Sequence, residues 1–246
     1  MYSPRLRFFT LAIACSIALS HNASAKPVRC VSPNERNAIV IDVVKDGVVY
    51  SVFVDNRVLF ASARCGPDLQ GVDLLEGQSK LVDVQHGKFN RTFDLPWGKT
   101  KQVTDRCSFA VLTIESEKGV RWQVELRAYD DGVAFRYRLL HQDGLAEFTI
   151  QDERTQFLPT GEPVALFNTL DGFTTSHESI YERMKLSNIP TGRLIDCPFL
   201  LEWPDGKAAA IMEARVREFA GLYLERETEK STSFRCRLSP LSLIHI

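Results

Sequence analysis

Residues 121–140 alternate largely between apolar and polar side chains, and this pattern constrains the fold more than any other feature of the sequence. The apolar set lies on both sides of a turn at 130–132 and comprises Trp122, Val124, Leu126, Ala128, Val133, Phe135, Tyr137 and Leu139. Successive side chains of a strand point to opposite faces, so a period of two places this set on one face of a sheet. A helix would require apolar residues spaced three and four apart, and that spacing is absent. The pattern predicts an antiparallel hairpin.

Three further turns join runs that have the composition of strands. Asp46-Gly47 lies between two β-branched runs, and glycine tolerates the positive φ that a tight hairpin turn requires. Asp55-Asn56 marks the next turn along the chain. Residues 204–206 read Pro-Asp-Gly and predict a third hairpin, which pairs 197–203 with 207–214.

Two stretches between these hairpins, residues 66–90 and 156–186, are less regular. Only 180–186 is predicted to form a short helical turn. Many strands separated by turns, with no fixed-period repeat and no linker, indicate one all-β domain. The expected fold class is a large antiparallel β-sandwich.

The composition excludes several classes of function. The chain of 246 residues carries 30 basic and 31 acidic side chains, so it has no basic footprint for nucleic acid and no reason for strong attraction to an anionic membrane. The sequence contains no glycine-rich phosphate loop, no G-x-S-x-G elbow and no H-E-x-x-H motif. The sequence therefore does not indicate a nucleotide-binding protein, a serine hydrolase or a zinc protease of those types.

The beginning of the chain has the organisation of a signal peptide. Arg5 and Arg7 precede an apolar stretch over 8–19, which is too short to span a bilayer. The small residues of Ala23-Ser24-Ala25 predict cleavage after Ala25, hence export to the periplasm of a Gram-negative bacterium and no membrane association after cleavage. A lipoprotein anchored through Cys15 is the competing interpretation, although the residues before Cys15 fit a lipobox poorly.

The expected organisation is a signal peptide over 1–25, one β-sandwich domain over 26–237 and an irregular tail over 238–246. The tail has neither strand alternation nor a terminal cap, so we expect a truncation or a foreign sequence there.

Five cysteines follow the predicted cleavage site: Cys30, Cys65, Cys107, Cys197 and Cys236. An oxidising compartment permits disulfides, but the odd count leaves at least one thiol unpaired. No CxxC or Cys/His spacing indicates zinc. Buried or unpaired cysteines, with one or two bridges allowed, are the expectation.

Five short segments follow one another in a fixed order along the mature chain. They are Ser32-Pro33 with the paired strands that end at 50–52, Pro96-Trp97-Gly98-Lys99, the run from Arg127 to Tyr137, Phe148-Thr149-Ile150 leading to Glu153 and Phe157, and Glu178-x-x-Tyr181 joined to Glu213-Ala214. In this order, over roughly residues 30 to 225, the chain resembles the amino-terminal β-domain of glycoside hydrolase family 97 enzymes.

The resemblance implies a β-super-sandwich of the galactose mutarotase-like type, followed in complete members by a (β/α)₈ barrel and a small β-domain. Family members are calcium-dependent enzymes that act on α-glucosides or α-galactosides, and their catalytic carboxylates lie on the barrel. This chain does not reach the barrel, so the resemblance implies no catalytic residue here. An oligosaccharide substrate and the barrel of the same polypeptide are the implied partners, and the fragment alone is expected to be inactive.

Glu178 is the residue that the resemblance assigns to metal binding. In the family, the matching glutamate reaches from the β-domain to a calcium ion, and barrel glutamates complete the shell. Calcium takes six to eight oxygen ligands, so one carboxylate from this chain would hold it weakly or not at all until the barrel is present. From residue type alone, Glu178 would instead be a solvated loop acid.

Three more residues are expected at the substrate pocket. Tyr181 either contacts sugar or packs on its own loop. Glu213 ends an apolar run, where a charge is costly unless paired or at a strand end, and it either faces the site or leaves the sheet edge into solvent. Many relatives carry a histidine just before it, where this chain has Met212. Trp97, in a Pro-Trp-Gly turn, either stacks on a sugar face or anchors its loop.

Two other functions remain open. A free-standing carbohydrate-binding β-sandwich would need Trp97 and Trp203 to form an exposed platform, whereas Trp122 is expected in the core. A structural or interaction domain without a sugar site is the third alternative. His177 adjoins Glu178 and either shapes that loop or is an ordinary surface residue.

Overall fold

The computed structural model describes residues 26–45, 47–143, 145–214, 216 and 219–240. The predicted signal peptide, Cys15 and most of the predicted tail lie outside the described residues. Over the described part the chain forms nineteen strands and one short 3₁₀ helix, Leu186–Asn188. No helix in this part is long and apolar enough to cross a membrane.

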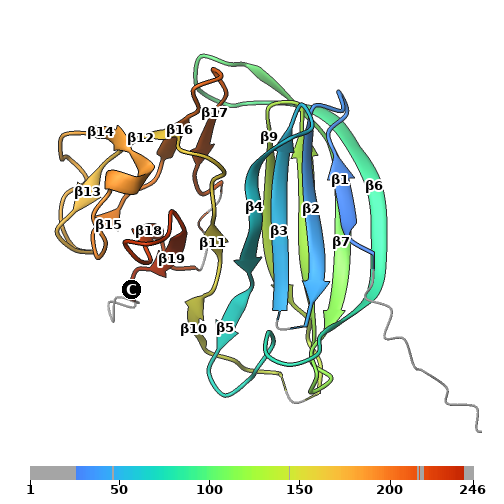
Figure 1. The fold of residues 1–246 in the computed structure, drawn as a ribbon. Helices are drawn as coiled ribbons and strands as arrows, with labels where there is room; N and C mark the ends of the chain where they lie inside the picture. The colour runs from blue at the N-terminus through green and yellow to red at the C-terminus, as the bar shows by residue number, and fades with distance from the viewer. Residues whose placement is uncertain (1–25, 46, 144, 215, 217–218, 241–246) are drawn as a thin grey trace, which may run out of the picture.

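Two four-stranded antiparallel sheets face each other and form the main sandwich, on the right in Figure 1. The first has the order β1-β2-β3-β4: β1 (Val28–Val31), β2 (Asn37–Val44), β3 (Gly47–Val54) and β4 (Arg57–Cys65). The second has the order β6-β7-β8-β9: β6 (Lys80–Asp94), β7 (Gln102–Glu115), β8 (Arg121–Tyr129) and β9 (Gly132–Leu139). One hydrophobic core lies between them and takes side chains from both sheets, such as Ile39, Tyr50, Leu112 and Trp122.

The predicted alternation is confirmed in β8. Trp122, Val124, Leu126 and Ala128 have no exposed surface, and β8 pairs with β9 from Trp122↔Leu139 to Tyr129↔Gly132. The β2–β3 hairpin is also confirmed by its pairing from Asn37↔Val54 to Val44↔Gly47, although Asp46 itself is not described.

A second set of sheets lies to the left in Figure 1 and encloses its own core. One sheet has the order β14-β12-β16-β17: β14 (Glu182–Lys185), β12 (Val164–Phe167), β16 (Phe199–Glu202) and β17 (Ala208–Ile211). The other has the order β11-β19-β18-β15-β13: β11 (Gln156–Phe157), β19 (Phe234–Leu238), β18 (Leu222–Arg226), β15 (Leu194–Ile195) and β13 (Thr169–Leu170). A ribbon of β5 (Pro67–Leu69) and β10 (Ile150–Glu153) accompanies them. Leu59 and Phe60 of β4 enter this second core, so β4 serves both.

Two local predictions are wrong. Residues 180–186 do not form a helical turn, because Glu182–Lys185 pairs with β12 as an edge strand and the 3₁₀ helix begins only at Leu186. Residues 80–90, within the stretch predicted to be irregular, belong to the fifteen-residue strand β6, whose backbone pairs with β7 along its whole length. The hairpin predicted over 197–214 is confirmed as β16 and β17.

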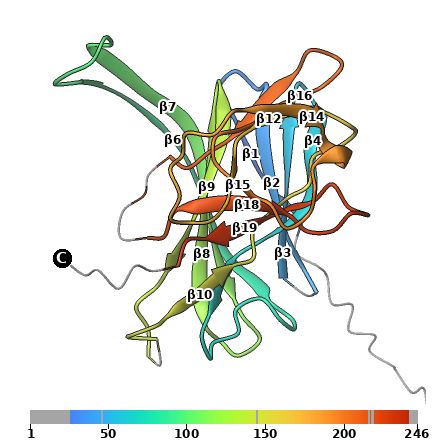
Figure 2. The same cartoon turned by 90° about the vertical axis from the view of Figure 1, so that its left-hand side faces the viewer.

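β6 and β7 continue beyond the rest of their sheet as a two-stranded arm, residues 90–106. The last pair between β7 and β8 is Cys107↔Tyr129, whereas β6 and β7 remain paired out to Asp94↔Gln102. Figure 2 shows the arm extending away from the body at the upper left. Every residue from 90 to 101 is exposed.

The fold class predicted from sequence, an all-β antiparallel sandwich, is confirmed. All five described cysteines are free thiols; four are buried, and Cys197 is half-buried.

Candidate functional site

The predicted metal ligand lies on an exposed loop between β13 and β14, residues 171–181. Glu178 is exposed, and among the described residues no side chain or backbone group forms a hydrogen bond or ion pair with its carboxylate. Two apolar neighbours on the same loop are also exposed, Ile180 by 90% and Tyr181 by 48%. The carboxylate is therefore available to a cation or a partner outside the described residues.

The same loop is fastened to the domain at two points. His177 Nδ1 lies 2.7 Å from Asp196 Oδ2, and the amide of Asn168 donates to the His177 carbonyl over 3.5 Å. The ring of Phe173 packs edge-on against Tyr223 with centroids 5.2 Å apart. The loop thus combines fixed contacts on its inner side with a free carboxylate on its outer side.

Glu213 lies two residues beyond the end of β17 and is exposed. Its Oε2 accepts a hydrogen bond from the Leu222 backbone N–H over 3.0 Å, at the first residue of β18. Met212, where relatives often have histidine, is 60% exposed. Glu213 therefore lies beyond the end of its strand, with its carboxylate tied to the start of β18.

The carboxylates of Glu213 and Asp196 contribute to raised pKa values of two groups near β18. Burial, with the charges of Glu213 and Asp196, raises the pKa of the Cys197 thiol to about 12. Burial, followed by the charges of Asp196 and Glu213, also raises the pKa of Tyr223. The loop of Glu178 contacts the beginning of β18 through Phe173 and Tyr223, and Glu213 contacts it through the Leu222 backbone. Two segments that are distant in sequence therefore meet at the same strand end.

A half-buried acid, Glu153, lies within range of the Glu213 charge. Burial raises the pKa of Glu153, and the charges of Glu213 and then Asp152 raise it further, against a hydrogen bond that lowers it. That bond comes from Thr155 Oγ1, 2.6 Å from Glu153 Oε1, and Thr155 in turn lies 2.6 Å from the Tyr137 hydroxyl. Glu153 is thus a half-buried, hydrogen-bonded acid of the scaffold.

The three tryptophans have different environments. Trp97 lies in the turn of the arm and is 83% exposed. Trp122 is fully buried, as predicted. Trp203 is only 3% exposed; its indole N–H donates to the Thr160 carbonyl over 2.7 Å, and its ring packs on Phe60. The paired platform of Trp97 and Trp203 is therefore wrong, because the alternation of β16 turns Trp203 inward.

The donor set for calcium within this chain is small. Among the described residues no group of three or more His, Cys, Asp or Glu side chains could hold a metal ion. Glu178 offers one free carboxylate, which suits a hard cation but supplies only one or two of six to eight ligands. The residues present fit a contribution to a shared calcium site.

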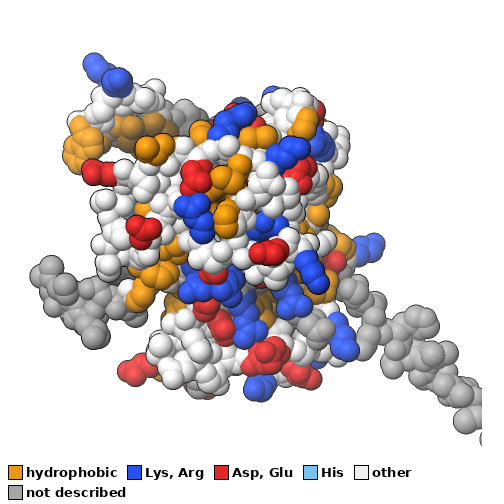
Figure 3. Space-filling model, turned by 60° about the vertical axis from the view of Figure 1, so that its left-hand side comes forward, with side chains coloured by type: hydrophobic (Ala, Val, Ile, Leu, Met, Phe, Trp, Pro, Cys, Tyr) orange, Lys and Arg blue, Asp and Glu red, His pale blue; other side chains and the backbone are white. Residues whose placement is uncertain are grey.

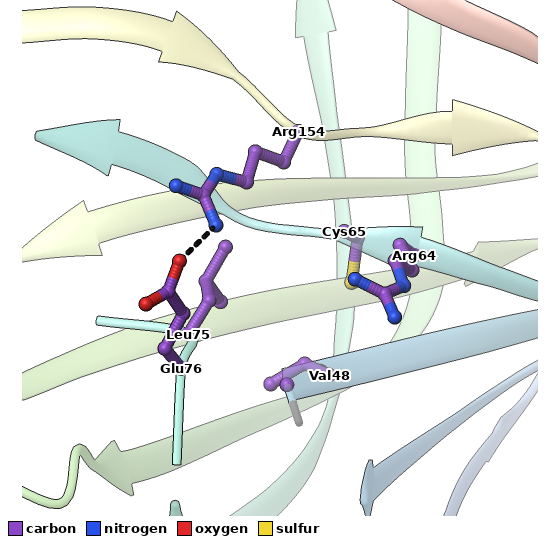
Figure 4. Close-up of a pocket in the computed structure, with 7 residues that line it drawn as sticks. Val48, Arg64, Cys65, Leu75, Glu76 and Arg154 are labelled. Atoms are coloured by element: carbon purple, nitrogen blue, oxygen red, sulfur yellow. Dashed lines mark hydrogen bonds and ion pairs between the residues drawn. The ribbon is translucent and has the colours of Figure 1, made fainter. Parts of the chain in front are cut away.

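One cavity lies away from this region. It has a volume of about 330 Å³ and is bordered by Arg64, Leu75, Glu76 and Arg154 (Figure 4). Arg154 is already bonded to both oxygens of Asp68, at 3.1 and 3.2 Å, and lies 3.5 Å from Glu76. None of the predicted site residues borders it.

Sequence reasoning missed two residues of the region, Asp196 and Tyr223, and assigned no role to a third, Glu153. Asp196 directly follows the short strand β15, and a carboxylate at a strand end is a weak signal that could have raised it. Tyr223 occupies an ordinary strand position, and Glu153 was noted only as part of a motif.

On the exposed face of the second set of sheets, neither acidic nor basic side chains predominate. Figure 3 shows acidic and basic side chains interspersed over it, with hydrophobic side chains and a few basic ones on the arm at the upper left. A strongly acidic or basic partner is therefore not indicated.

Comparisons with known proteins bear on the whole chain. A family model described as glycosyl-hydrolase 97 N-terminal matches residues 30–239. A retaining α-galactosidase of Bacteroides thetaiotaomicron is 24% identical over 229 residues, which is 89% of this chain and 33% of that protein.

Solved structures agree in fold. A family 97 enzyme from Pseudoalteromonas sp. strain K8, in complex with acarbose, matches with a TM-score of 0.79 and 24% identity over 87% of this chain and 32% of that one. A β-arabinopyranosidase matches with a TM-score of 0.76 and 22% identity over 85% of this chain and 35% of that one. The chain thus spans about a third of the length of these relatives. Because the family model covers most of the sequence, the chain belongs to the glycosyl-hydrolase 97 N-terminal family.

Proposed function

We propose that this chain is the amino-terminal carbohydrate-associated domain of an exported, calcium-dependent glycoside hydrolase that acts on α-glucosides or α-galactosides. The observation that carries the proposal is the free, exposed carboxylate of Glu178 on a fastened loop, in a chain that belongs to this family. The retaining α-galactosidase and the acarbose-bound enzyme among its relatives support the substrate class.

Glu178 would supply one ligand to a calcium ion, and a (β/α)₈ barrel of the same polypeptide would supply the others. When bound, calcium provides a fixed positive charge that holds and polarises oxygens of the sugar. The catalytic acid and the base or nucleophile would lie on the barrel, so the chain alone would not turn over substrate.

Tyr181 and Glu213 would form the part of the sugar pocket that this domain contributes. Tyr181 lies three positions after Glu178 and is 48% exposed, which suits stacking or a hydrogen bond with a pyranose. Glu213 keeps one oxygen on the Leu222 backbone, and its other oxygen, which has no bonded partner among the described residues, would accept from a sugar hydroxyl. Export to the periplasm, through the predicted signal peptide, is part of the same proposal.

The test compares Glu178→Ala with Glu147→Ala in the longer enzyme that joins this domain to its barrel. Glu147 is a matched control, since it is exposed and has no bonded partner among the described residues. Loss of an outer-shell partner of a metal ligand already costs about tenfold or more in affinity, so loss of the ligand itself should weaken calcium binding at least as much and lower kcat/KM at limiting calcium. Unchanged calcium affinity in Glu178→Ala would refute the proposal, and so would hydrolysis of an aryl α-glucoside or α-galactoside by residues 26–237 alone.

One observation favours a second function, a free-standing carbohydrate-binding module: Trp97 exposes 83% of its surface at the end of the arm. Since Trp122 and Trp203 are buried, a sugar-induced change in tryptophan emission from this chain would report mainly on Trp97. Saturable emission changes with maltose or melibiose, abolished in Trp97→Ala, would support the module. A flat titration would leave the first proposal as the better one.

A further inference from the structure

The loop that carries Glu178 is held by a carboxylate that lies outside it. Asp196, between β15 and β16, uses both of its oxygens: Oδ1 accepts from the Cys197 backbone N–H over 2.9 Å, and Oδ2 lies 2.7 Å from His177 Nδ1. Its own backbone N–H donates to the Asn168 carbonyl over 3.0 Å. With its side chain only 16% exposed, Asp196 is a fixed point of the scaffold.

The imidazole of His177 rests between that carboxylate and an aromatic ring. The centroids of His177 and Tyr223 are 6.0 Å apart at an interplanar angle of 34°, and Tyr223 is itself buried on β18. The Asn168 amide, from a residue that is 1% exposed, approaches the His177 carbonyl. Contacts to the side chain and to the backbone therefore fix one residue of an otherwise exposed loop.

Glu178 is the next residue in the chain and has no such contact among the described residues. Consecutive Cα atoms are about 3.8 Å apart, so fixing His177 confines the volume that the Glu178 carboxylate can sample. Groups that orient a ligand without touching the metal commonly control affinity, since a ligand ordered in advance loses less entropy on binding.

We propose that Asp196, acting through His177, is a positioning residue that holds Glu178 in the orientation in which it meets the cation. This inference rests on the proposed function of Glu178 as a calcium ligand. Neither Asp196 nor His177 is assigned a contact with the metal or the sugar. Their hydrogen bond needs only an N–H on Nδ1, which the neutral ring supplies in one tautomer.

Two substitutions of His177 separate positioning from simple loss of the ring. An asparagine side chain places its amide N–H near the position of Nδ1, so His177→Asn can keep the bond to Asp196. A glutamine side chain places its amide nearer to Nε2, so His177→Gln loses that bond at similar polarity. The His177 side chain is 51% exposed, and both variants are therefore expected to fold.

The first readout is amide hydrogen exchange over residues 172–181 in this 246-residue chain without metal. Losing a hydrogen bond to a charged group changes the equilibrium constant for local opening by roughly tenfold or more. Amide exchange in this loop should therefore be about tenfold faster in His177→Gln and in Asp196→Ala. Exchange in His177→Asn should stay within roughly twofold of the wild type. Equal exchange in the Asn and Gln variants would overturn the proposal.

The second readout is calcium affinity, measured by titration calorimetry in the longer enzyme. His177→Gln should weaken calcium binding by about tenfold, with affinity restored in His177→Asn. Faster loop exchange without a change in calcium affinity would also overturn the proposal. Glu178→Ala, measured in parallel, keeps the two claims separate: if it leaves calcium affinity unchanged, the ligand assignment fails, whereas the exchange data still decide whether Asp196 and His177 order the loop.

Discussion

Arg226 provides the sharpest test of how the second core is held together. This arginine is 4% exposed and has no acidic partner among the described residues. Its guanidinium instead donates to four backbone carbonyls, those of Ser231, Ser187, Ile189 and Glu229, at 2.8, 2.8, 2.6 and 2.8 Å. It thereby joins the β18–β19 turn to the segment around the 3₁₀ helix.

The substitution Arg226→Met keeps much of the length of the side chain and removes all of these donors. Each hydrogen bond to a charged group contributes roughly 1.5–3 kcal/mol, and an unsatisfied buried carbonyl costs about 1–3 kcal/mol. Methionine does not carry the desolvation cost of a buried guanidinium, and this difference offsets several kcal/mol of the loss. A net decrease of about 3–5 kcal/mol in the free energy of unfolding is therefore expected.

Urea unfolding followed by circular dichroism measures this loss, provided that the m-value is unchanged. Arg235→Met is the matched control: Arg235 lies on the neighbouring strand with its side chain 45% exposed and bonded to Glu225, so its loss should cost about 0–1 kcal/mol. A loss below about 1 kcal/mol in Arg226→Met, or equal losses in both variants, would refute the reasoning.

Two further predictions concern the tryptophans and the half-buried acid Glu153. Trp203→Ala should lower the free energy of unfolding by about 3–5 kcal/mol, whereas Trp97→Ala should change it by less than about 0.5 kcal/mol; equal thermal shifts would contradict this. Burial raises the pKa of Glu153 above its ordinary value of 4.5, so the folded state binds this proton more tightly than the unfolded state does. The contribution of Glu153 to stability is then present below the unfolded pKa and is lost as pH rises through the folded pKa. Glu153→Gln keeps an acceptor for Thr155 and should therefore gain stability relative to wild type as pH rises from the unfolded pKa of Glu153 through its raised folded pKa; a pH-independent difference in urea midpoint would count against it.

Much of the fold is predictable because burial in this protein follows local patterns. In β8 the core face is apolar at every second residue, and the turn residues between β8 and β9 match the hairpin. The same reasoning, applied to Phe199, Leu201 and Trp203, would have placed Trp203 in the core, since these three side chains alternate with half-exposed or exposed ones.

Strand β6 escaped prediction for a different physical reason. None of its residues is fully buried, so no apolar period marks it, and its length is set by pairing with β7. Gly87 within it reads as a turn signal, but a Cβ there would overlap the Phe109 ring on the adjacent strand. Such a requirement is visible only once the strands are paired.

The candidate site was predictable only in part. Glu178 and Tyr181 were found through resemblance to a family, since an exposed loop has no burial pattern of its own. The partner of that loop, Asp196, lies nineteen residues beyond His177 (196 − 177), and only the fold brings the two side chains together. Residues that act through tertiary contacts of this kind carry little local signal.

The most direct measurement is a structure of the longer enzyme determined with calcium bound. An oxygen of the Glu178 carboxylate is expected at about 2.3–2.6 Å from the ion, with the other ligands supplied by the barrel. A fully coordinated calcium ion that Glu178 does not reach, or a Glu178 side chain directed away from the barrel, would contradict this expectation.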